Sequence, residues 1–251
     1  MVKKIVGTGV LLVLALALQA GVKMYTLKSP DGKVKLEVTA GQGIAYSLFY
    51  DGRLLLKPSR IALHTDLPEA DHWENIRITG TKQRHVSETV QAPFYRVKEF
   101  GIDCNELELR LNNGFSLLMR AYNDGMAYRF VAGRKGEMTV VEERAEFNFA
   151  DDFEAYIPYS TNPKDPWNMA FQNFYTKAPL TQYNTELPAF LPLTVDAGAV
   201  KLTLLESDLE AYPGMFVRGD GKTPALKGVF AAYPQETFKN KWRCQETVKT
   251  R

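Results

Sequence analysis

The sequence predicts an all-β protein, a β-supersandwich of antiparallel sheets. From Lys33 onward the dominant hydrophobic period is two residues, the period of a strand with one buried and one solvated face. Turn signals recur at short spacing, and the 251 residues include 18 glycines and 13 prolines. No helical pattern extends beyond two or three turns. With 45% hydrophobic residues the chain can bury a large core, and sandwiches of this size occur as one domain.

The N-terminus has the pattern of a secretory signal peptide. Lys3 and Lys4 precede an apolar stretch from Ile5 to Leu18, and the chain turns polar at Lys23. We therefore predict a signal peptide over residues 1–20 and a periplasmic or secreted mature domain over residues 21–251. The apolar stretch is short for a membrane span and no stop-transfer pattern follows, so a retained anchor is the less favoured alternative.

The first strands of the mature chain are predicted from alternation and a hairpin turn. Residues 33–38 (KVKLEV) alternate polar and apolar side chains. Strands over residues 44–50 and 53–56 flank Asp51-Gly52, a dipeptide that favours a tight β-turn.

A three-stranded meander is predicted in the middle of the chain. Strands over residues 106–111, 115–122 and 126–131 are separated by Asn-Asn-Gly and Asn-Asp-Gly turns. Further strands are expected over residues 139–143, 146–149, 191–195, 200–205 and 228–233.

The stretch from Pro158 to Pro188 interrupts this regularity. It is rich in Pro, Asn, Tyr and Phe and contains Trp167. Long aromatic loops in compact β domains are more often functional or interface-forming than idle. No internal repeat and no Pro/Ser-rich linker divides the chain, so one domain is expected after the signal peptide.

Several classes of function lack a signature. The formal charge is only +2, from 31 basic and 29 acidic residues, and no basic run alternates with aromatics, which argues against nucleic acid as a partner. No Gly-x-Ser-x-Gly elbow or phosphate-binding glycine loop is present. Cys104 and Cys244 lie far apart, so a disulfide is permitted but not implied, and with three histidines they form no zinc pattern.

One strand end is a candidate site. The strand over residues 200–205 runs into Glu206, Asp208 and Glu210, and a Tyr-Pro-Gly turn follows. A rigid turn can hold one carboxylate in place, and carboxylates are the ligands that Ca²⁺ prefers. The alternative is a solvated acidic loop, and carboxylate pairs for acid–base chemistry stay open because any two can meet in space.

Aromatic and histidine side chains offer a second set of candidates. The aromatics present flat faces for sugar rings, or else fill the core or an interface. A histidine could serve as a general base, or lie on the surface without a catalytic role. The residues concerned are Trp73, Trp167, Trp242, Tyr156, Tyr159, Phe171, Phe174, Tyr175, Tyr183, His64, His72 and His85.

An ordered set of short motifs resembles the N-terminal domain of glycoside hydrolase family 97, the secreted α-glucosidases and α-galactosidases. The motifs are SPDGK at 29–33, IAYS at 44–47, RAYNDGMAYRF at 120–130, FYTKAPL at 174–180, LPL at 191–193 and ESDLEAYPGM at 206–215. Each is weak alone, but together and in order they cover nearly all of the mature chain.

The resemblance implies a β-supersandwich similar to galactose-mutarotase-like folds. In the family this domain packs against a (β/α)₈ barrel that carries the catalytic carboxylates, and in calcium-dependent inverting members it lends a glutamate to an active-site Ca²⁺. The matching residue here is Glu206, with Asp208 and Glu210 as alternatives. No catalytic residue is assigned to this chain, which stops at Arg251 where family members continue into the barrel.

The sequence thus predicts a non-catalytic module, possessing a surface for carbohydrate (an α-glucoside or α-galactoside) and for the barrel, and inactive as a glycosidase alone. An exposed barrel-facing surface would favour self-association. Two alternatives stay open: a free-standing aldose mutarotase and a stand-alone carbohydrate-binding module.

Overall fold

The structure is a computed structural model, and it describes residues 23–164, 166–167, 173–207, 209, 212–231, 234–239 and 245–250. Nearly all regular structure in it is antiparallel β-sheet, and the described helical structure is one 3₁₀ turn, η1 (Leu180–Gln182). The predicted all-β class is confirmed. The predicted signal peptide lies outside the described residues, and the division at residue 20 stays a prediction.

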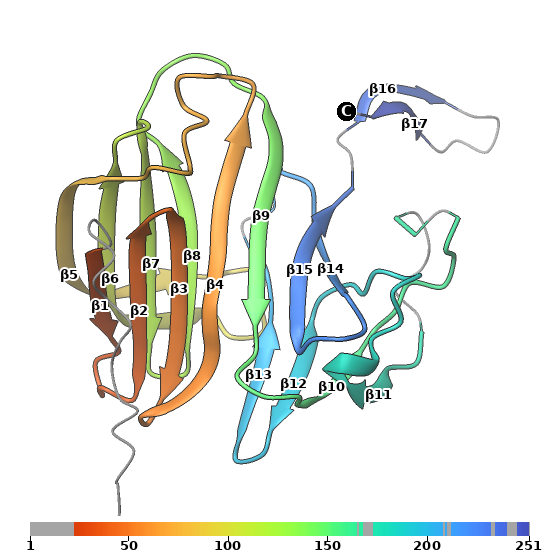
Figure 1. Cartoon of the computed structure of the whole chain (residues 1–251), viewed down its shortest axis with the longest axis horizontal. Helices are drawn as coiled ribbons and strands as arrows, with labels where there is room; N and C mark the ends of the chain where they lie inside the picture. Colours follow the sequence, from red (N-terminus) through yellow and green to blue (C-terminus); the bar gives the residue numbers. More distant parts are fainter. Residues whose placement is uncertain are drawn as a thin grey trace, which may run out of the picture.

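The largest sheet of the fold has seven strands (Figure 1). Its strand order is β1-β2-β3-β4-β9-β15-β14, and each neighbouring pair is antiparallel. The strands are β1 (Lys23–Lys28), β2 (Val34–Gly41), β3 (Gly43–Tyr50), β4 (Arg53–Thr65), β9 (Val140–Asn148), β15 (Ala225–Phe230) and β14 (Met215–Gly219).

The predicted Asp51-Gly52 hairpin joins β3 to β4. Tyr50 pairs with Arg53, so the loop has two residues, and both have positive φ, 48° at Asp51 and 78° at Gly52. Two positive φ angles match the right-handed twist of the flanking strands, which explains why this dipeptide is a strong hairpin signal.

A four-stranded sheet covers the N-terminal half of the large sheet. It contains β5 (Ile78–Gln91), β6 (Glu99–Leu111), β7 (Phe115–Tyr122) and β8 (Gly125–Ala132) in chain order, and Figure 1 shows it behind β1–β4. The predicted meander is β6, β7 and β8. Alternate residues such as Leu109 and Leu117 have no exposed surface, because they fill the space between the two sheets.

A third, smaller sheet lies beyond β14 and β15. Its order is β11-β10-β12-β13, with β10 (Glu154–Ile157), β11 (Thr176–Pro179), β12 (Leu193–Ala197) and β13 (Val200–Leu204). Ala189 connects this region to the large sheet through isolated bridges to Tyr159 and Val217. A separate hairpin follows, β16 (Pro234–Lys239) with β17 (Gln245–Thr250).

Strand β9 corrects one sequence expectation. Two strands were predicted, over residues 139–143 and 146–149, but residues Val140–Asn148 form a single strand between β4 and β15. The charged run Glu142-Glu143-Arg144 resembles a turn in sequence. Glu142 and Glu143 instead keep strand pairing with His64 and Leu63 on β4.

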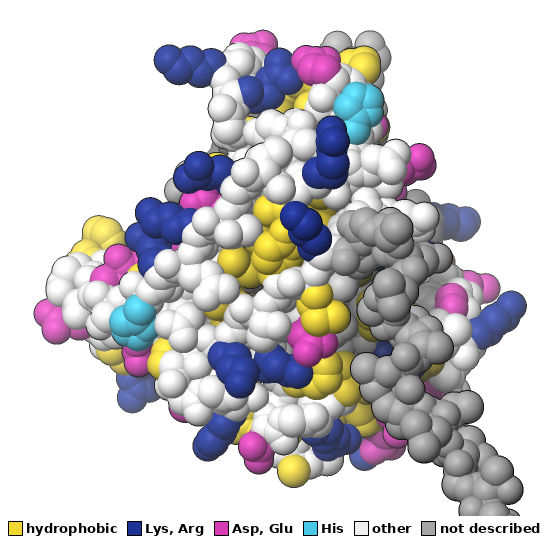
Figure 2. All heavy atoms as spheres, turned by 60° about the vertical axis from the view of Figure 1, so that its left-hand side comes forward, with side chains coloured by type: hydrophobic (Ala, Val, Ile, Leu, Met, Phe, Trp, Pro, Cys, Tyr) yellow, Lys and Arg dark blue, Asp and Glu magenta, His cyan; other side chains and the backbone are white. Residues whose placement is uncertain are grey.

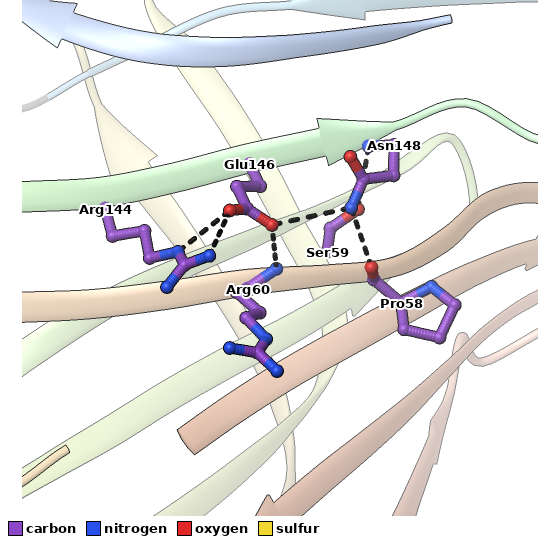
Figure 3. A network of polar contacts seen from close by, with 6 residues as sticks. All are labelled: Pro58, Ser59, Arg60, Arg144, Glu146 and Asn148. Atoms are coloured by element: carbon purple, nitrogen blue, oxygen red, sulfur yellow. Dashed lines mark hydrogen bonds and ion pairs between the residues drawn. The ribbon is translucent and has the colours of Figure 1, made fainter. Parts of the chain in front are cut away.

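A polar network fastens β9 to β4 (Figure 3). Glu146, 8% exposed, accepts hydrogen bonds from the Arg144 guanidinium and from the Arg60 backbone N–H. Asn148 donates from its side chain to the Pro58 carbonyl at 2.8 Å, and its backbone N–H donates to the Ser59 hydroxyl at 2.9 Å. The buried polar groups here are therefore satisfied within the network.

Candidate carboxylate site after strand β13

Glu206 lies in the connection between β13 and β14. We call residues 205–214 the Glu206 segment; residues 208, 210 and 211 of it are outside the described part of the chain. The Met215 backbone N–H donates to both Glu206 oxygens, at 2.9 Å to Oε1 and 2.8 Å to Oε2. The carboxylate thus closes the segment onto the first residue of β14.

The Tyr-Pro-Gly turn lies directly against this carboxylate. A Cβ atom added at Gly214 would lie 3.3 Å from Glu206 Oε1, closer than most such contacts in proteins. The absence of a side chain at Gly214 therefore gives the carboxylate its room.

A second carboxylate, Glu143 of β9, lies near Glu206. The Tyr212 hydroxyl donates to Glu143 Oε2 at 2.7 Å, and Tyr128 of β8 also hydrogen-bonds to Glu143. Burial raises the pKa of Glu143 and the negative charge of Glu206 raises it further, while the two tyrosine hydroxyls oppose the shift.

Partial burial also raises the pKa of Glu206, against the stabilising Met215 N–H. The charges of these two partly desolvated carboxylates repel each other, and a bound cation would stabilise both. Carboxylate oxygens suit a hard cation such as Ca²⁺.

The described residues offer only part of a metal site. Among them, no group of three or more His, Cys, Asp and Glu side chains is placed to hold a metal ion. Glu206 fits a role as one oxygen ligand, and the remaining ligands would have to come from elsewhere. Asp208 and Glu210, the alternative ligands, lie outside the described residues.

Three of the seven candidate aromatics that the structure describes lie in the core. Trp73 is buried and its indole N–H donates to the Leu63 carbonyl at 2.9 Å. Tyr159 and Tyr183 are buried with ring centroids 5.0 Å apart. Trp167 packs edge-on against Phe216 at 5.0 Å. Trp242 and Phe171 lie outside the described residues.

Three candidate aromatics are exposed near the edge of the small sheet. Phe174 is 94% exposed, Tyr175 is 48% exposed and Tyr156 is 37% exposed. Tyr156 lies on β10, and Phe174 and Tyr175 directly precede β11, its neighbour. These rings are available to a ligand or partner.

The histidines do not form a pair. His64 lies on β4 with Nδ1 2.7 Å from Asp71 Oδ1, whereas His85 lies on β5, in the other sheet, beside Asn105 and Asp103. His72 lies in the loop after β4.

Cys104 is a buried free thiol whose pKa is raised by burial, and Cys244 lies outside the described residues. The face in Figure 2 mixes basic and acidic side chains around a few hydrophobic ones, unlike a continuous basic surface. No helix in the described part of the chain is long and apolar enough to cross a membrane.

Sequence reasoning found Glu206 but missed Glu143, Tyr128 and Tyr212 as its surroundings. One signal was available for Glu143: it shares the alternation phase of Ala145 and Phe147, which are both buried. A carboxylate in the buried phase of a strand indicates a group with a partner.

Two facing antiparallel sheets, joined to a smaller sheet that ends in a fixed carboxylate, define a large β-sandwich domain. The family model described as "Glycosyl-hydrolase 97 N-terminal" matches residues 27–248. The chain therefore belongs to this family, and the predicted resemblance is confirmed.

Relatives and solved structures agree with the assignment. A retaining alpha-galactosidase of Bacteroides thetaiotaomicron is 39% identical over 88% of this chain and 34% of its own length. A probable retaining alpha-galactosidase of Streptomyces bingchenggensis is 26% identical over 61% of this chain and 24% of its own length. The chain thus spans about a third or less of these curated relatives.

A family 97 enzyme from Pseudoalteromonas sp. strain K8, solved in complex with panose, has a TM-score of 0.68 and 18% identity, over 82% of this chain and 32% of that one. A beta-arabinopyranosidase structure has a TM-score of 0.69 and 20% identity, over 82% of this chain and 35% of that one. At these identities the likeness shows the fold.

Proposed function

We propose that this chain is the non-catalytic N-terminal module of a secreted family 97 α-glycosidase, acting on α-galactosides in preference to α-glucosides. The observation that carries the proposal is the family match over residues 27–248. The two curated relatives, both named as α-galactosidases, support the substrate preference. The module supports a catalytic barrel and contributes to the carbohydrate-facing surface.

Glu206 is proposed as one ligand of a Ca²⁺ ion shared with the barrel. Its carboxylate supplies oxygen donors, and the Met215 N–H holds both oxygens in a fixed orientation. The bound ion would supply electrostatic stabilisation of charge that develops on the sugar or its leaving group. Glu143 adds negative charge nearby without being assigned as a ligand.

The test of the module role uses the purified 251-residue protein and an enzyme that joins the same domain to its barrel. We expect no hydrolysis of aryl α-galactosides or α-glucosides by the 251-residue chain. Turnover by the chain alone, retained after active-site inhibitors of contaminating glycosidases are added, would overturn the non-catalytic assignment.

The test of the metal role is Glu206→Gln in the joined enzyme, with Glu186→Gln as a matched exposed control. Calcium affinity, measured by titration calorimetry, should fall about tenfold or more on loss of one charged ligand. Equal affinities in the two variants would remove Glu206 from the site.

A second candidate, carbohydrate binding by the module alone, is favoured by the exposed rings of Tyr156, Phe174 and Tyr175. Saturable melibiose binding that is lost in Tyr175→Ala would support it. The mutarotase alternative is disfavoured by the separation of His64 and His85 on different sheets. Polarimetry of α-galactose equilibration decides between these two.

A further inference from the structure

We propose that Tyr212, acting through Glu143, is a positioning residue that fixes the Glu206 segment and so orients the Glu206 carboxylate. The inference deepens the proposed metal role and rests on it for its function. Its structural part, the tether itself, is testable without any metal.

The described residues of the Glu206 segment are held by two kinds of hydrogen bond. One is local: the Met215 N–H closes the segment on Glu206 itself. The other is distant: the Tyr212 hydroxyl reaches Glu143, 69 positions earlier in the chain and in the middle of β9. The Met215 bond ties Glu206 to β14 at the edge of the large sheet, and the Tyr212 bond ties the segment to β9, two strands further into the same sheet.

Among the described residues of the segment, the two leucines are exposed and Tyr212 packs against the hydrophobic core. Leu205 is 66% exposed and Leu209 is 49% exposed. The ring of Tyr212, in contrast, packs edge-on against Phe230 of β15 with centroids 5.9 Å apart. Segments with few buried apolar contacts open easily, so a single well-placed tether controls their position.

Glu143 also has a second partner, which comes from the facing sheet. Tyr128 of β8 hydrogen-bonds to Glu143, and the Tyr128 ring lies 6.0 Å from that of buried Tyr46. The acceptor is thus supported from both facing sheets. A hydrogen bond to an ionised carboxylate is shorter and stronger than one between neutral groups.

The choice of residue at position 143 supports a role beyond filling space. A partly buried carboxylate costs stability that an apolar side chain in the same strand phase would not. At Glu143 this cost is offset by a carboxylate acceptor for the Tyr212 hydroxyl. The Tyr212–Glu143 bond therefore relates the position of Glu206 to the rigid centre of the domain.

Hydrogen exchange at the Met215 amide measures the position of Glu206 directly, because that N–H is bonded to the Glu206 carboxylate. Tyr212→Phe removes one hydroxyl and keeps the ring. We expect it to accelerate exchange at Met215 about tenfold, the effect of losing a hydrogen bond to a charged group. Amides of Leu117 and Met119 in β7 should exchange as in the unaltered protein.

The matched control is Tyr175→Phe, the same chemical change at a hydroxyl that lies 3.5 Å from the Pro192 carbonyl. Glu143→Gln is the second variant, and it stays informative if Tyr212→Phe disturbs folding. The double variant Tyr212→Phe with Glu143→Gln should exchange no faster at Met215 than the faster single variant.

The tether would be overturned by equal Met215 exchange in Tyr212→Phe and Tyr175→Phe, or by single-variant effects that multiply in the double variant. Faster exchange at β7 as well as Met215 would also overturn it, in favour of general destabilisation. Calcium titration of the joined enzyme is read separately. If Glu206→Gln leaves calcium affinity unchanged but Tyr212→Phe accelerates exchange at the Met215 amide, the metal role fails and the tether stands.

Discussion

Arg144 and Glu146 lie on the same face of β9, and Arg144 Nε and Nη2 contact Glu146 Oε1 at 2.8 and 2.6 Å. Glu146 Oε2 accepts the Arg60 backbone N–H at 3.2 Å. Burial alone would raise the pKa of Glu146, but these donors outweigh it and hold the pKa below its ordinary value. The pair thus keeps a buried charge where the large sheet joins β4 to β9.

Arg144→Ala should destabilise the protein by about 1–3 kcal/mol, because it leaves the Glu146 carboxylate without its charged partner. The control is Arg110→Ala, which breaks a pair of the same spacing with Glu108 on β6. Arg110 is 62% exposed in its side chain, so its pair should be worth less than about 1 kcal/mol. Urea unfolding of both variants checks the difference, and equal losses would contradict the assignment of the Glu146 network.

Acid should destabilise the fold through Glu106 and Glu146. Burial would raise the pKa of Glu106, but hydrogen bonds from Arg84 and Arg120 outweigh burial and lower this pKa. The pKa of Glu146 is lowered in the same way by its own donors. A lowered folded-state pKa gives stability that is present above the ordinary carboxyl pKa of 4.5 and is lost as the pH falls through the folded value.

Glu106→Gln should therefore cost stability at pH 7, and its difference from the unaltered protein should shrink as the pH falls below about 4.5. Unfolding free energy measured from pH 3 to 7 tests this. Glu108→Gln on the same strand serves as the control for a change of charge alone. A Glu106→Gln difference that stays constant with pH would show that the arginine pairs do not carry the effect.

Gly52→Ala should destabilise the β3–β4 hairpin by about 1–2 kcal/mol, because a side chain is strained at a φ of 78°. No atom beyond the neighbouring residues lies within 4 Å of the added Cβ, so the cost comes from strain in the local backbone. Gly125→Ala is the control: its surroundings are equally open and its φ is not positive. Thermal unfolding should separate the two variants by several degrees, and matching midpoints would argue against strain at Gly52.

The strand pattern was largely predictable because it depends on local chemistry. Alternation along β2 and the Asp51-Gly52 turn are properties of neighbouring residues, and both predicted elements are present. The long strand β5 was missed because its sequence, ITGTKQRHVSETVQ, is polar in both phases and only Val86 is buried. Its strand state comes from pairing with β6 over its whole length, which no local pattern encodes.

The candidate site was predictable only where it depends on neighbouring residues in the sequence. Glu206 follows its strand and precedes Pro213-Gly214 in sequence, so its fixed position could be inferred locally. Its surroundings come from β8 and β9, and only tertiary pairing brings Tyr128 and Glu143 to Tyr212.

The β5–β6 turn, residues 92–98, should promote self-association. Phe94 is 97% exposed, Tyr95 is 69% exposed and Val97 is 53% exposed. Adjacent exposed apolar side chains at a hairpin turn favour contact with other chains. The double substitution Phe94→Ser with Tyr95→Ser should lower the weight-average mass that sedimentation equilibrium gives at high protein concentration.

The control for this experiment is Val141→Ser, which removes one isolated apolar side chain that is 67% exposed. If the control lowers the mass as much as the turn variant does, or if the unaltered protein is monomeric at every concentration, the turn is not the associating surface.

The position of β9 between β4 and β15 also has a consequence for synthesis. The entire β5–β8 sheet is encoded between β4 and β9, so β4 emerges from the ribosome long before its partner. At about 5–20 residues per second the edge of β4 stays open for several seconds, and an open edge can pair with any other strand. The nascent chain is therefore most exposed to misassembly in the interval between Thr65 and Val140, when the large sheet has only its first four strands.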